Sequence, residues 1–473
     1  MSCTTLLVGK NASYDGSTLI ARNEDSGAGS YSSKKFIVVQ PEDQPRKYVS
    51  KISGVEIDLP ENPMRYTCMP NAYDKEGIWG AAGTNEVNVS MTATETITTN
   101  QRVQAADPVT YDLENNKPLG IGEEDLVTLT LPYIHSAKEG VERLGMLHET
   151  YGTYEMNCIA FSDVNEIWCF ETIGGHHWMA RRVPDDCYVV MPNQLGSDKF
   201  DFEDAYGEQK EYMCSKDLKE FVENNHLDLS LDGKFNPRDA FGSKSDSDHT
   251  YNTSRAWWME RVLNPRTFDW DGMSADYRYD DNDIPWCLVP EKKITIEDVK
   301  YVLSGHYQGT PYDCYQTGEK TLRPIGINRN NFLSIHQLRP YKNDSIMSVE
   351  WIAYGSNVFN AIVPFFTNVN DTPSYLKDTT EKVTTDSFYW ANRLIGALSD
   401  ASYKECASYI ERYQLKVESL GHRLIESATD DSNLEEINQK ISDTVQKETD
   451  DLLYKVLKER SDHMLNSFSR SDA

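Results

Sequence analysis

The chain has 473 residues, of which 39% are hydrophobic and 11% aromatic, enough apolar material for a large folded core. Its formal net charge is −28, and such a surface repels nucleic-acid phosphates and anionic lipids. We therefore expect no nucleic-acid partner and no membrane partner. There is no apolar run long enough for a membrane span and no basic, apolar leader. Nine scattered cysteines without a CxxC pair favour reduced thiols in a cytoplasmic protein.

The first 200 residues are predicted to be mostly strands, interrupted by one helical stretch. That stretch, EEDLVTLTLPYIHSAKEGVERLGMLHETYG, has helical spacing with a kink expected at Pro132. The last four of the strands predicted in these 200 residues are separated by short turns, so we expect them to form a meander. The predicted strands lie at 4–8, 18–22, 35–40, 78–82, 87–94, 157–161, 167–172, 177–182 and 187–191.

The second half begins with a polar, aromatic stretch, for which we predict a helix near 200–224 and another in SRAWWMERVL. Trp257 and Trp258 in that second helix are expected in the core rather than as a substrate platform. LSIHQL and MSVEWIAYG then indicate strands, and the chain from residue 388 to its end reads as helical.

In the helical C-terminal part, Ser432 and Glu435 are predicted to form a capping box. The apolar residues that follow have helix spacing, so their face packs either on the protein's own core or against another subunit. The simplest account is one large domain, residues 3–390, with a helical extension over 391–473.

A cysteine stands at position 3, at the start of a strand-like run, TTLLV. If Met1 and Ser2 are removed as a short propeptide, Cys3 carries both a thiol and a free α-amino group. That amine titrates near about 7.7–8.0, so it can accept the thiol proton. One residue then supplies both nucleophile and base. If Ser2 stays, the mechanism loses its base.

The next strand ends in ARNED, and antiparallel pairing with 4–8 would return this end to Cys3. Arg22 could then hold the thiolate, and Asp25 could orient the amine. The alternative is an ordinary surface ion pair at a strand end.

The opening CTTLLVG…DGSTLIARNED resembles the bacterial dipeptidase A family of thiol-dependent N-terminal-nucleophile (Ntn) hydrolases. It is more distantly similar to the cysteine acylases that cleave conjugated bile salts and penicillin V. The resemblance extends over most of the chain, with supporting patterns at 83–97, 171–186, 191–194 and 251–258. It implies an α+β fold, the four-layer αββα sandwich of the Ntn hydrolases.

Carried over residue by residue, the resemblance makes Cys3 the nucleophile, Arg22 the arginine beside its sulfur and Asp25 the carboxylate that contacts the amine. Asn193 matches the asparagine of the oxyanion hole, whose amide stabilises charge on the carbonyl oxygen. Without the resemblance, Asn193 reads as a turn asparagine.

Four further residues are expected to bind substrate. Asn85 in GTNE matches a region that shapes the site, and Arg255 resembles a later arginine of the acylases at a different spacing. The ammonium group of a dipeptide needs a carboxylate, for which Glu24 and Glu86 are the candidates.

We expect no metal and no cofactor. His176 and His177 are adjacent, so on a strand they point to opposite faces, and the sequence contains no HExxH. A pairing of Cys3 with His135 or His177 stays open, because spatial neighbours cannot be read from sequence.

The favoured hypothesis is a cytoplasmic thiol dipeptidase of broad side-chain tolerance that acts on dipeptides and forms a homo-oligomer. Two alternatives remain: an acylase for a non-peptide amide, and a non-enzymatic protein resembling the secernins. The intact CTT and RNED blocks favour an enzyme.

Overall fold

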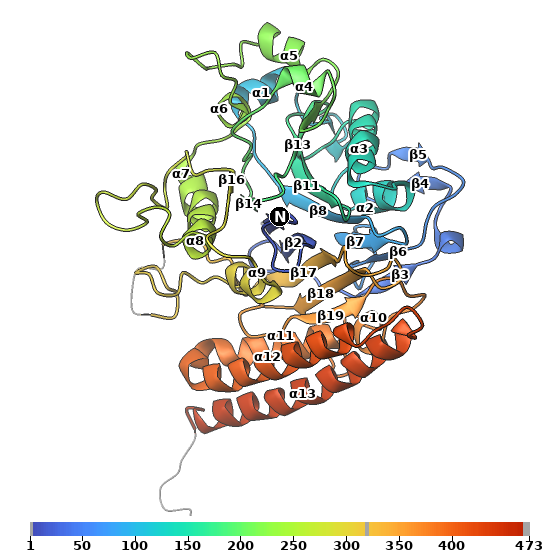
Figure 1. Ribbon diagram of the computed structural model, residues 1–473, viewed down its shortest axis with the longest axis vertical. Coiled ribbons are helices and arrows are strands. Elements are labelled where there is room, and N and C mark those ends of the chain that lie inside the picture. The colour runs from blue at the N-terminus through green and yellow to red at the C-terminus, as the bar shows by residue number, and fades with distance from the viewer. Residues whose placement is uncertain (1–2, 317–320, 467–473) are drawn as a thin grey trace, which may run out of the picture.

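The computed structural model describes residues 3–316 and 321–466 and has mixed α/β architecture built on two large antiparallel sheets (Figure 1). The first has seven strands and contains the N-terminal strand β1. In spatial order its strands are β16 (Cys287–Leu288), β14 (Tyr188–Met191), β1 (Thr4–Val8), β2 (Thr18–Asp25), β17 (Asn330–Leu338), β18 (Ser348–Tyr354) and β19 (Val363–Phe366). β1 thus lies inside the sheet, and Figure 1 shows its start in the middle of the molecule.

The second sheet has eight strands. Their spatial order is β15 (Tyr212–Cys214), β13 (Trp178–Arg182), β12 (Ile167–Thr172), β11 (Asn157–Ser162), β8 (Ser90–Thr96), β7 (Ala82–Asn85), β6 (Tyr66–Cys68) and β3 (Ile37–Val39). Two short hairpins stand apart from it, β4 (Lys47–Val49) with β5 (Glu56–Asp58) and β9 (Tyr111–Asp112) with β10 (Lys117–Pro118).

The predicted meander is only partly correct. Its first three runs are the neighbours β11, β12 and β13, but the fourth, β14, leaves them and pairs with β1 in the other sheet. The place beside β13 is taken by β15, which interrupts the helix predicted at 200–224. All of β14 is buried, so its apolar run carries no alternation that would assign it to either sheet.

Helices lie outside the two sheets. The predicted kink at Pro132 is a 3-10 turn, η2 (Leu131–Tyr133), between α2 and α3. Two further 3-10 turns are η1 (Pro41–Asp43) and η4 (Asp400–Ser402), and η3 (His249–Thr253) is a π-helical segment that leads into α8. The helices are α1 (Gln101–Ala106), α2 (Leu126–Thr130), α3 (Ala137–Tyr151), α4 (Phe202–Ala205), α5 (Leu218–Asn224), α6 (Pro237–Phe241), α7 (Asp246–Asp248), α8 (Ser254–Leu263), α9 (Ile296–Leu303), α10 (Ser374–Lys377), α11 (Phe388–Ser399), α12 (Tyr403–Glu426) and α13 (Leu434–Asp462).

The two sheets face each other, since β2 contacts both β8 and β11. Their shared core contains side chains that alternate along the strands of the first sheet, Leu7, Ile20 and Val189. The opposite face of β1 carries Leu6 and Val8, which belong to the core under α8 and α9. Trp257 and Trp258 of α8 are only 2% exposed in that core, as predicted. β1 is therefore held on both faces.

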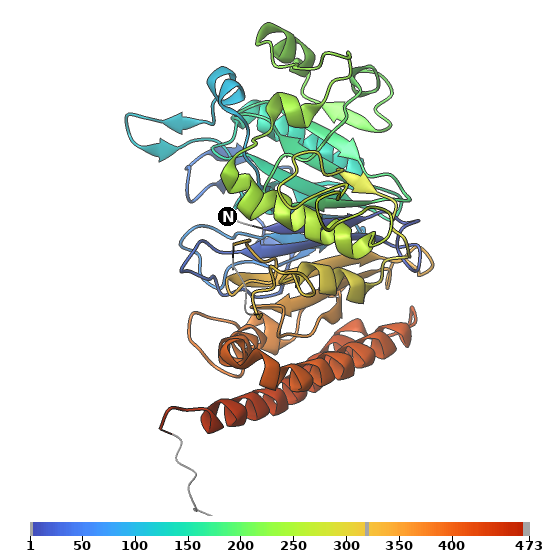
Figure 2. The same ribbon diagram turned by 90° about the vertical axis from the view of Figure 1, so that its left-hand side faces the viewer.

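The C-terminal helices pack on the same molecule. α11 contacts β18, whereas α12 and α13 contact β19, and Figure 2 shows the last two as a layer beside the seven-stranded sheet. Ile441, Val445 and Leu452 of α13 belong to one core cluster that reaches back to Leu6. The apolar face of α13 thus packs on the protein's own core, the first of the two interpretations.

The predicted start of α13 is displaced by one residue, and its N-cap is a single Asn side chain rather than a Ser–Glu capping box. Asn433, not Ser432, is the N-cap of α13, and its side chain accepts a hydrogen bond from the backbone of Glu436. Both Ser and Asn are good N-caps, so SNLE alone does not decide between them.

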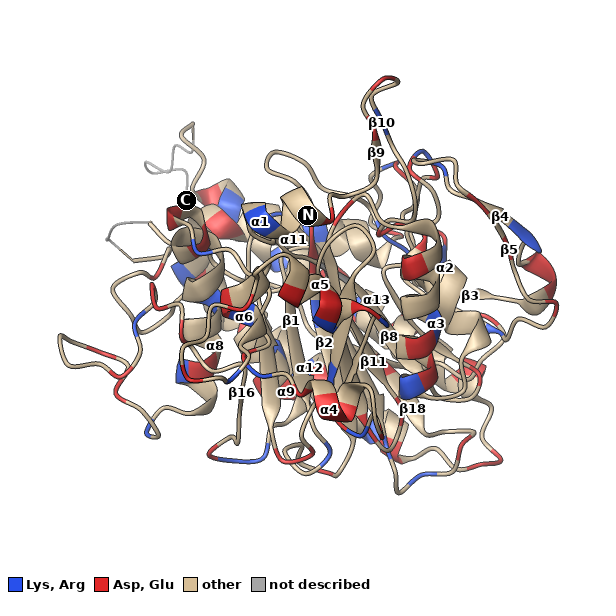
Figure 3. Ribbon diagram, turned by 90° about the horizontal axis from the view of Figure 1, so that it is seen from above, with Lys and Arg blue, Asp and Glu red and all other residues tan. Residues whose placement is uncertain are grey.

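Acidic and basic positions are interspersed on the outer helix α3, as Figure 3 shows. Among the described helices there is none that combines the length and the apolar character needed to cross a bilayer.

Candidate active site

The site begins with the register between β1 and β14. Thr5 pairs with Met191 in this antiparallel ladder, and continuing the same register by two residues sets Cys3 opposite Asn193. Residues opposite each other in a ladder point to the same face of the sheet. The register therefore brings together two residues that are 190 positions apart in sequence.

Arg22 reaches Cys3 from β2, the strand on the other side of β1 from β14. It pairs with Thr5, so its side chain lies on the face that also carries Cys3. Arg22 Nη2 is 3.0 Å from Cys3 Sγ, and Nη1 donates to the carbonyl of Ala81 over 3.0 Å and to that of Ala93. The guanidinium, fully buried, thus connects the first sheet to the second beside the sulfur. Ala81 holds its carbonyl there with φ at +62°, a costly conformation for a residue with a Cβ.

Buried charges surround this guanidinium. Arg22 lies 2.7 Å from a carboxylate oxygen of Glu123 and 3.7 Å from one of Glu24, and Lys34 lies 2.7 Å from Glu24. Burial alone would lower the pKa of Arg22, but Cys3, Glu123 and Glu24 raise it above its ordinary value. Burial lowers the pKa of Lys34. A permanent cation at the sulfur favours the thiolate form, which is the nucleophilic form of cysteine.

Asn193 and Arg255 form the other side of the site. Arg255 donates from Nη2 to Asn193 Oδ1 over 2.7 Å, and from Nη1 to Thr4 Oγ1 over 2.6 Å and to the carbonyl of Cys3. Asn193 donates from Nδ2 to the carbonyl of Thr96 over 2.8 Å. Because Arg255 only donates, this contact fixes which end of the Asn193 amide carries the N–H groups. The amide is therefore oriented before any substrate arrives.

Asp25 is the last residue of β2, and it lies at the same end of the strands as Cys3. Its carboxylate is bound by Arg323 and by the side chain of Asn330. Asn330 also pairs with Asp25 in the ladder between β2 and β17. Asp25 is completely buried, so this ion pair is shielded from solvent.

Asn85 and Glu86 are not brought to the sulfur. Asn85 donates to the carbonyls of Leu131 and Ile134, and its side-chain oxygen accepts from the backbone N–H groups of Val87 and Val89, which holds the turn after β7. It is four residues beyond Ala81, the residue whose carbonyl contacts Arg22, and that is about 13 Å along a strand. Glu86 follows in the same turn. Glu24 is adjacent to the site but is already bound by Lys34 and Asn331.

The histidines considered as bases have carboxylate partners of their own. His135 pairs with Glu139 at the start of α3, and His177 pairs with Asp107 at 2.8 Å. Among the described residues, these ring nitrogens are therefore not paired with Cys3.

Sequence reasoning missed several members of the site, including Glu123, Lys34 and Arg323. Each lies in a segment without a recognisable motif, and each reaches the site only through tertiary packing.

The backbone N–H of Glu123 also donates to the carboxylate of Glu155 over 2.8 Å. Burial, followed by the charge of Glu123, raises the pKa of Glu155 to about 7.

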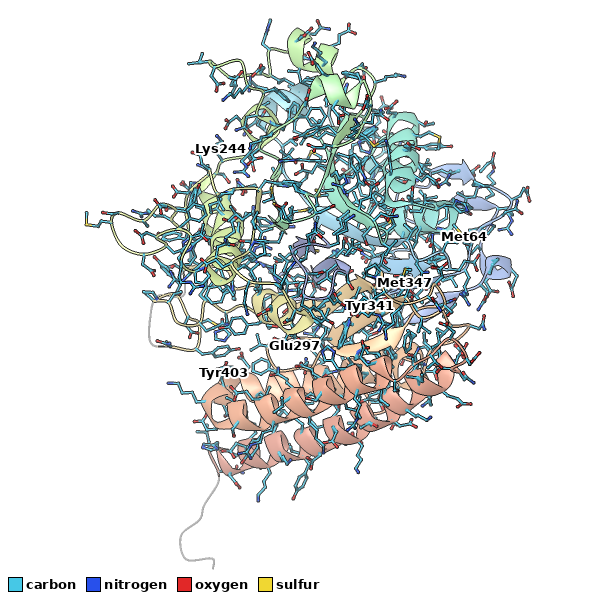
Figure 4. All side chains as sticks on the ribbon, viewed as in Figure 1. Met64, Lys244, Glu297, Tyr341, Met347 and Tyr403 are labelled. Carbon is cyan, nitrogen blue, oxygen red and sulfur yellow. The ribbon has the colours of Figure 1, made fainter. Side chains whose placement is uncertain are left out.

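A cavity of about 1150 Å³ opens beside Asn193. Asp239, Lys244 and Tyr251 contribute to its wall, and Figure 4 labels Lys244 on the outer side of the molecule. Its hydroxyl-bearing side chains are Thr96, Thr98, Thr99, Ser243, Ser245, Ser247 and Tyr251. A polar cavity of this size can accommodate a small, charged molecule.

A smaller cavity of about 270 Å³ lies between α9 and α12, where Figure 4 labels Glu297 and Tyr403. His306 in its wall is 2.8 Å from Asp313, and with Cys314 they could hold a metal ion. The ring of His306 also contacts the hydroxyl of Tyr403. This smaller cavity is separate from the buried charges around Arg22.

A family model described as "Peptidase family C69" matches residues 2–416. The chain belongs to peptidase family C69. A "Dipeptidase" of Bifidobacterium longum is 59% identical over 443 aligned positions, which cover 91% of this chain and 83% of that protein. A "Probable dipeptidase A" of Streptococcus pyogenes is 52% identical and covers all of this chain and 98% of its own length. A "Dipeptidase A" of Lactobacillus helveticus is 45% identical, covering 97% and 96% respectively.

Membership in C69 makes the chain a peptidase, and the recognition of dipeptidase A features in its opening residues is confirmed. The match includes Cys3, Arg22, Asp25, Asn193 and Arg255 within its bounds.

Proposed function

We propose that this C69 peptidase is a dipeptidase of broad specificity that uses Cys3 as an N-terminal nucleophile. The observation that carries the proposal is the 3.0 Å contact between Arg22 and the Cys3 sulfur, in a sheet whose register aligns Asn193 with Cys3. The dipeptidase names of relatives that match nearly the whole chain support the choice of substrate.

The fold is the αββα sandwich of the Ntn hydrolases. Two facing antiparallel sheets and helices outside both of them support this assignment. Residues 3–390 carry the chemistry, and the helical extension from residue 391 supports it through the core cluster that joins Leu6 to Val456. The last residues of that extension, 467–473, lie outside the described residues.

In the reaction, Cys3 Sγ attacks the carbonyl carbon of the peptide bond. Asn193 Nδ2 and backbone N–H groups donate to the oxyanion, while Arg22 stabilises the thiolate before attack. The α-amino group of Cys3 takes the thiol proton and delivers it to the leaving amine. Water then attacks the thioester, releases the first amino acid and returns the proton to sulfur.

This scheme requires that Met1 and Ser2, which lie outside the described residues, are removed. Asp25 then accepts a hydrogen bond from the new ammonium or amino group and orients it. The intact mass of the purified protein and its amino-terminal sequence test this step. Loss of Met1 and Ser2 supports the proposal, whereas a chain that hydrolyses dipeptides with Ser2 still attached contradicts it.

The test of the nucleophile is Cys3→Ala, assayed on several dipeptides in the presence of a chelator. We expect loss of turnover with an unchanged thermal unfolding midpoint. Cys287→Ala, in the edge strand β16 of the same sheet, is the matched control and should retain turnover. Undiminished cleavage by Cys3→Ala would overturn the mechanism. Cleavage of a non-peptide amide without cleavage of dipeptides would instead favour an acylase.

The nine scattered cysteines without a CxxC pair support a cytoplasmic location. The expected homo-oligomer remains a prediction, which sedimentation velocity of the mature protein measures.

A further inference from the structure

Arg329 lies at the end of the strands of the seven-stranded sheet where Cys3 and Asp25 also lie. It immediately precedes Asn330, the residue that pairs with Asp25 in the ladder between β2 and β17. The backbone N–H of Ser26 donates to the carbonyl of Arg329 over 3.0 Å, which fixes the main chain beside the end of β2. The side chain thus starts from an anchored position at the end of β2, the strand that pairs with β1.

The other guanidinium groups of this region already have strong partners. Arg22 is bound by Glu123, Arg255 by Asn193, and Arg323 by Asp25. Arg329 differs, because its guanidinium makes neither a hydrogen bond nor an ion pair within the part of the chain that the structure describes. Its Nε is buried and has no hydrogen-bond partner there. A half-buried cation without an anion is costly, so such a group points to an anionic ligand.

The surroundings of Arg329 show where that ligand would lie. Burial and then Arg323 lower the pKa of Arg329, whereas Asp25, Tyr251 and Cys3 act in the opposite direction. Tyr251 also lines the large cavity together with Asn193. Arg329, one residue from the Asn330 that binds Asp25, therefore lies in the same region as Cys3, Asp25 and the cavity wall.

We infer that Arg329 binds the free α-carboxylate of the dipeptide, an inference that rests on the proposed dipeptidase function. In a dipeptide, three bonds separate this carboxylate carbon from the carbonyl carbon that Cys3 attacks. A guanidinium matches a carboxylate with two parallel hydrogen bonds, which fixes orientation as well as charge. Arg329 is thus a specificity-determining residue.

This assignment explains how the site can tolerate many side chains and still select dipeptides. The recognised group belongs to the main chain, so it is the same in every dipeptide. In a tripeptide the terminal carboxylate lies up to about 3.6 Å farther along the chain and misses Arg329. The enzyme then measures peptide length from the scissile bond to the carboxylate.

The test compares alanyl-leucine with its C-terminal amide, which lacks the negative charge but keeps the scissile bond. The measured quantity is the ratio of kcat/KM for the acid to kcat/KM for the amide. We expect wild type to prefer the acid, and Arg329→Met to lower the ratio about 10- to 100-fold, the range for a hydrogen bond to a charged group. Arg329→Lys should lie between them, since it keeps the charge but not the two-pronged geometry.

Arg266→Met is the matched control, because Arg266 is an exposed arginine paired with Glu291, and it should keep the wild-type ratio. An unchanged ratio in Arg329→Met, or a wild type that cleaves acid and amide equally well, overturns the inference and leaves the dipeptidase proposal standing. A wild type that cleaves neither substrate overturns both. If Arg329→Met does not fold, Arg329→Lys and the wild-type comparison decide the question.

Discussion

Arg22 Nη2 lies 3.0 Å from Cys3 Sγ, and neither side chain is accessible to solvent. The same guanidinium donates to two carbonyls of the facing sheet and pairs with Glu123. Its position therefore depends on both sheets at once. A buried cation held in this way stabilises a thiolate more strongly than a surface arginine, because solvent does not screen it.

Arg22→Lys keeps the positive charge but cannot make all of these contacts with one ammonium group. We expect alkylation of Cys3 by iodoacetamide at pH 6.5 to slow severalfold, because weaker stabilisation of the thiolate leaves less of the reactive form. The Cys3 peptide is followed by mass spectrometry over a range of pH. Arg65→Lys, which alters an arginine bound to Asn370, is the control. Equal alkylation profiles in wild type and Arg22→Lys would contradict the role given to Arg22.

Asn193→Ala should lower kcat about 100- to 1000-fold with little change in KM, since an oxyanion donor acts mainly in the transition state. Steady-state kinetics on one dipeptide measures both constants. Asn224→Ala removes an exposed amide that contacts Glu220 and should leave both constants unchanged. A rise in KM with unchanged kcat would show that Asn193 binds the ground state instead.

Gly9→Ala tests the pairing that aligns Asn193 with Cys3. Gly9 follows β1, and an added Cβ would lie 2.5 Å from the carbonyl oxygens of both Pro184 and Asp185. Because both obstacles are backbone atoms, we expect the free energy of unfolding to fall by about 1–3 kcal/mol. Dipeptidase activity should also fall, as the β1–β14 ladder shifts. Urea denaturation measures the first effect.

Gly27→Ala serves as the control for this change. Its added Cβ would meet only the Ser30 hydroxyl at 3.5 Å, on an exposed loop. The free energy of unfolding should stay within about 0.5 kcal/mol of wild type. An equal loss in both variants would mean that the close approach at Gly9 does not decide the outcome.

Glu350→Gln should change how stability depends on pH. Burial raises the pKa of Glu350 from 4.5 to about 8, and His336 beside it is kept neutral because burial lowers its pKa to about 3. Between pH 4.5 and 8 the folded protein therefore holds a proton that the unfolded chain releases. The contribution of Glu350 to the free energy of unfolding therefore falls as the pH rises through this window, by something on the order of 2–4 kcal/mol. His336, which stays neutral in the folded protein, contributes in the opposite direction below about pH 6.5, so the net decline is expected between pH 6.5 and 8.

Glutamine has the shape of the protonated acid and does not ionise, so Glu350→Gln should flatten that decline and be more stable than wild type at pH 8. Thermal unfolding at pH 5.5 and 8 measures the difference. Glu139→Gln, at an exposed position on α3, should leave the pH dependence as it is. Parallel pH profiles for wild type and Glu350→Gln would contradict a raised pKa.

The core of the site was predictable because it depends on local chain geometry. Cys3 and Arg22 lie on adjacent strands joined by one short loop, so antiparallel pairing alone implied their proximity. The β-prone apolar run TTLLV predicted β1 correctly, and the helix predicted in SRAWWMERVL, which carries Trp257, is α8.

The remaining members depend on contacts that no local pattern encodes. Glu123 and Arg329 are 101 and 307 positions from Arg22, in segments whose composition marks neither of them. Asn85 was assigned from a motif whose structural role, the turn after β7, is the same whether or not a site lies nearby. The strand β14 was predicted in the wrong sheet, because a short, fully buried run fits the centre of either sheet equally well.

The central place of β1 has a consequence for the order of synthesis. Cys3 leaves the ribosome among the first residues, but its neighbours on β14, the guanidinium of Arg255 and the Arg323 that binds Asp25 follow much later. At 5–20 residues per second, roughly 16 to 64 s separate the translation of Cys3 from that of Arg323. A nascent chain thus carries its thiol without the surroundings that activate it until about two-thirds of the protein has been made.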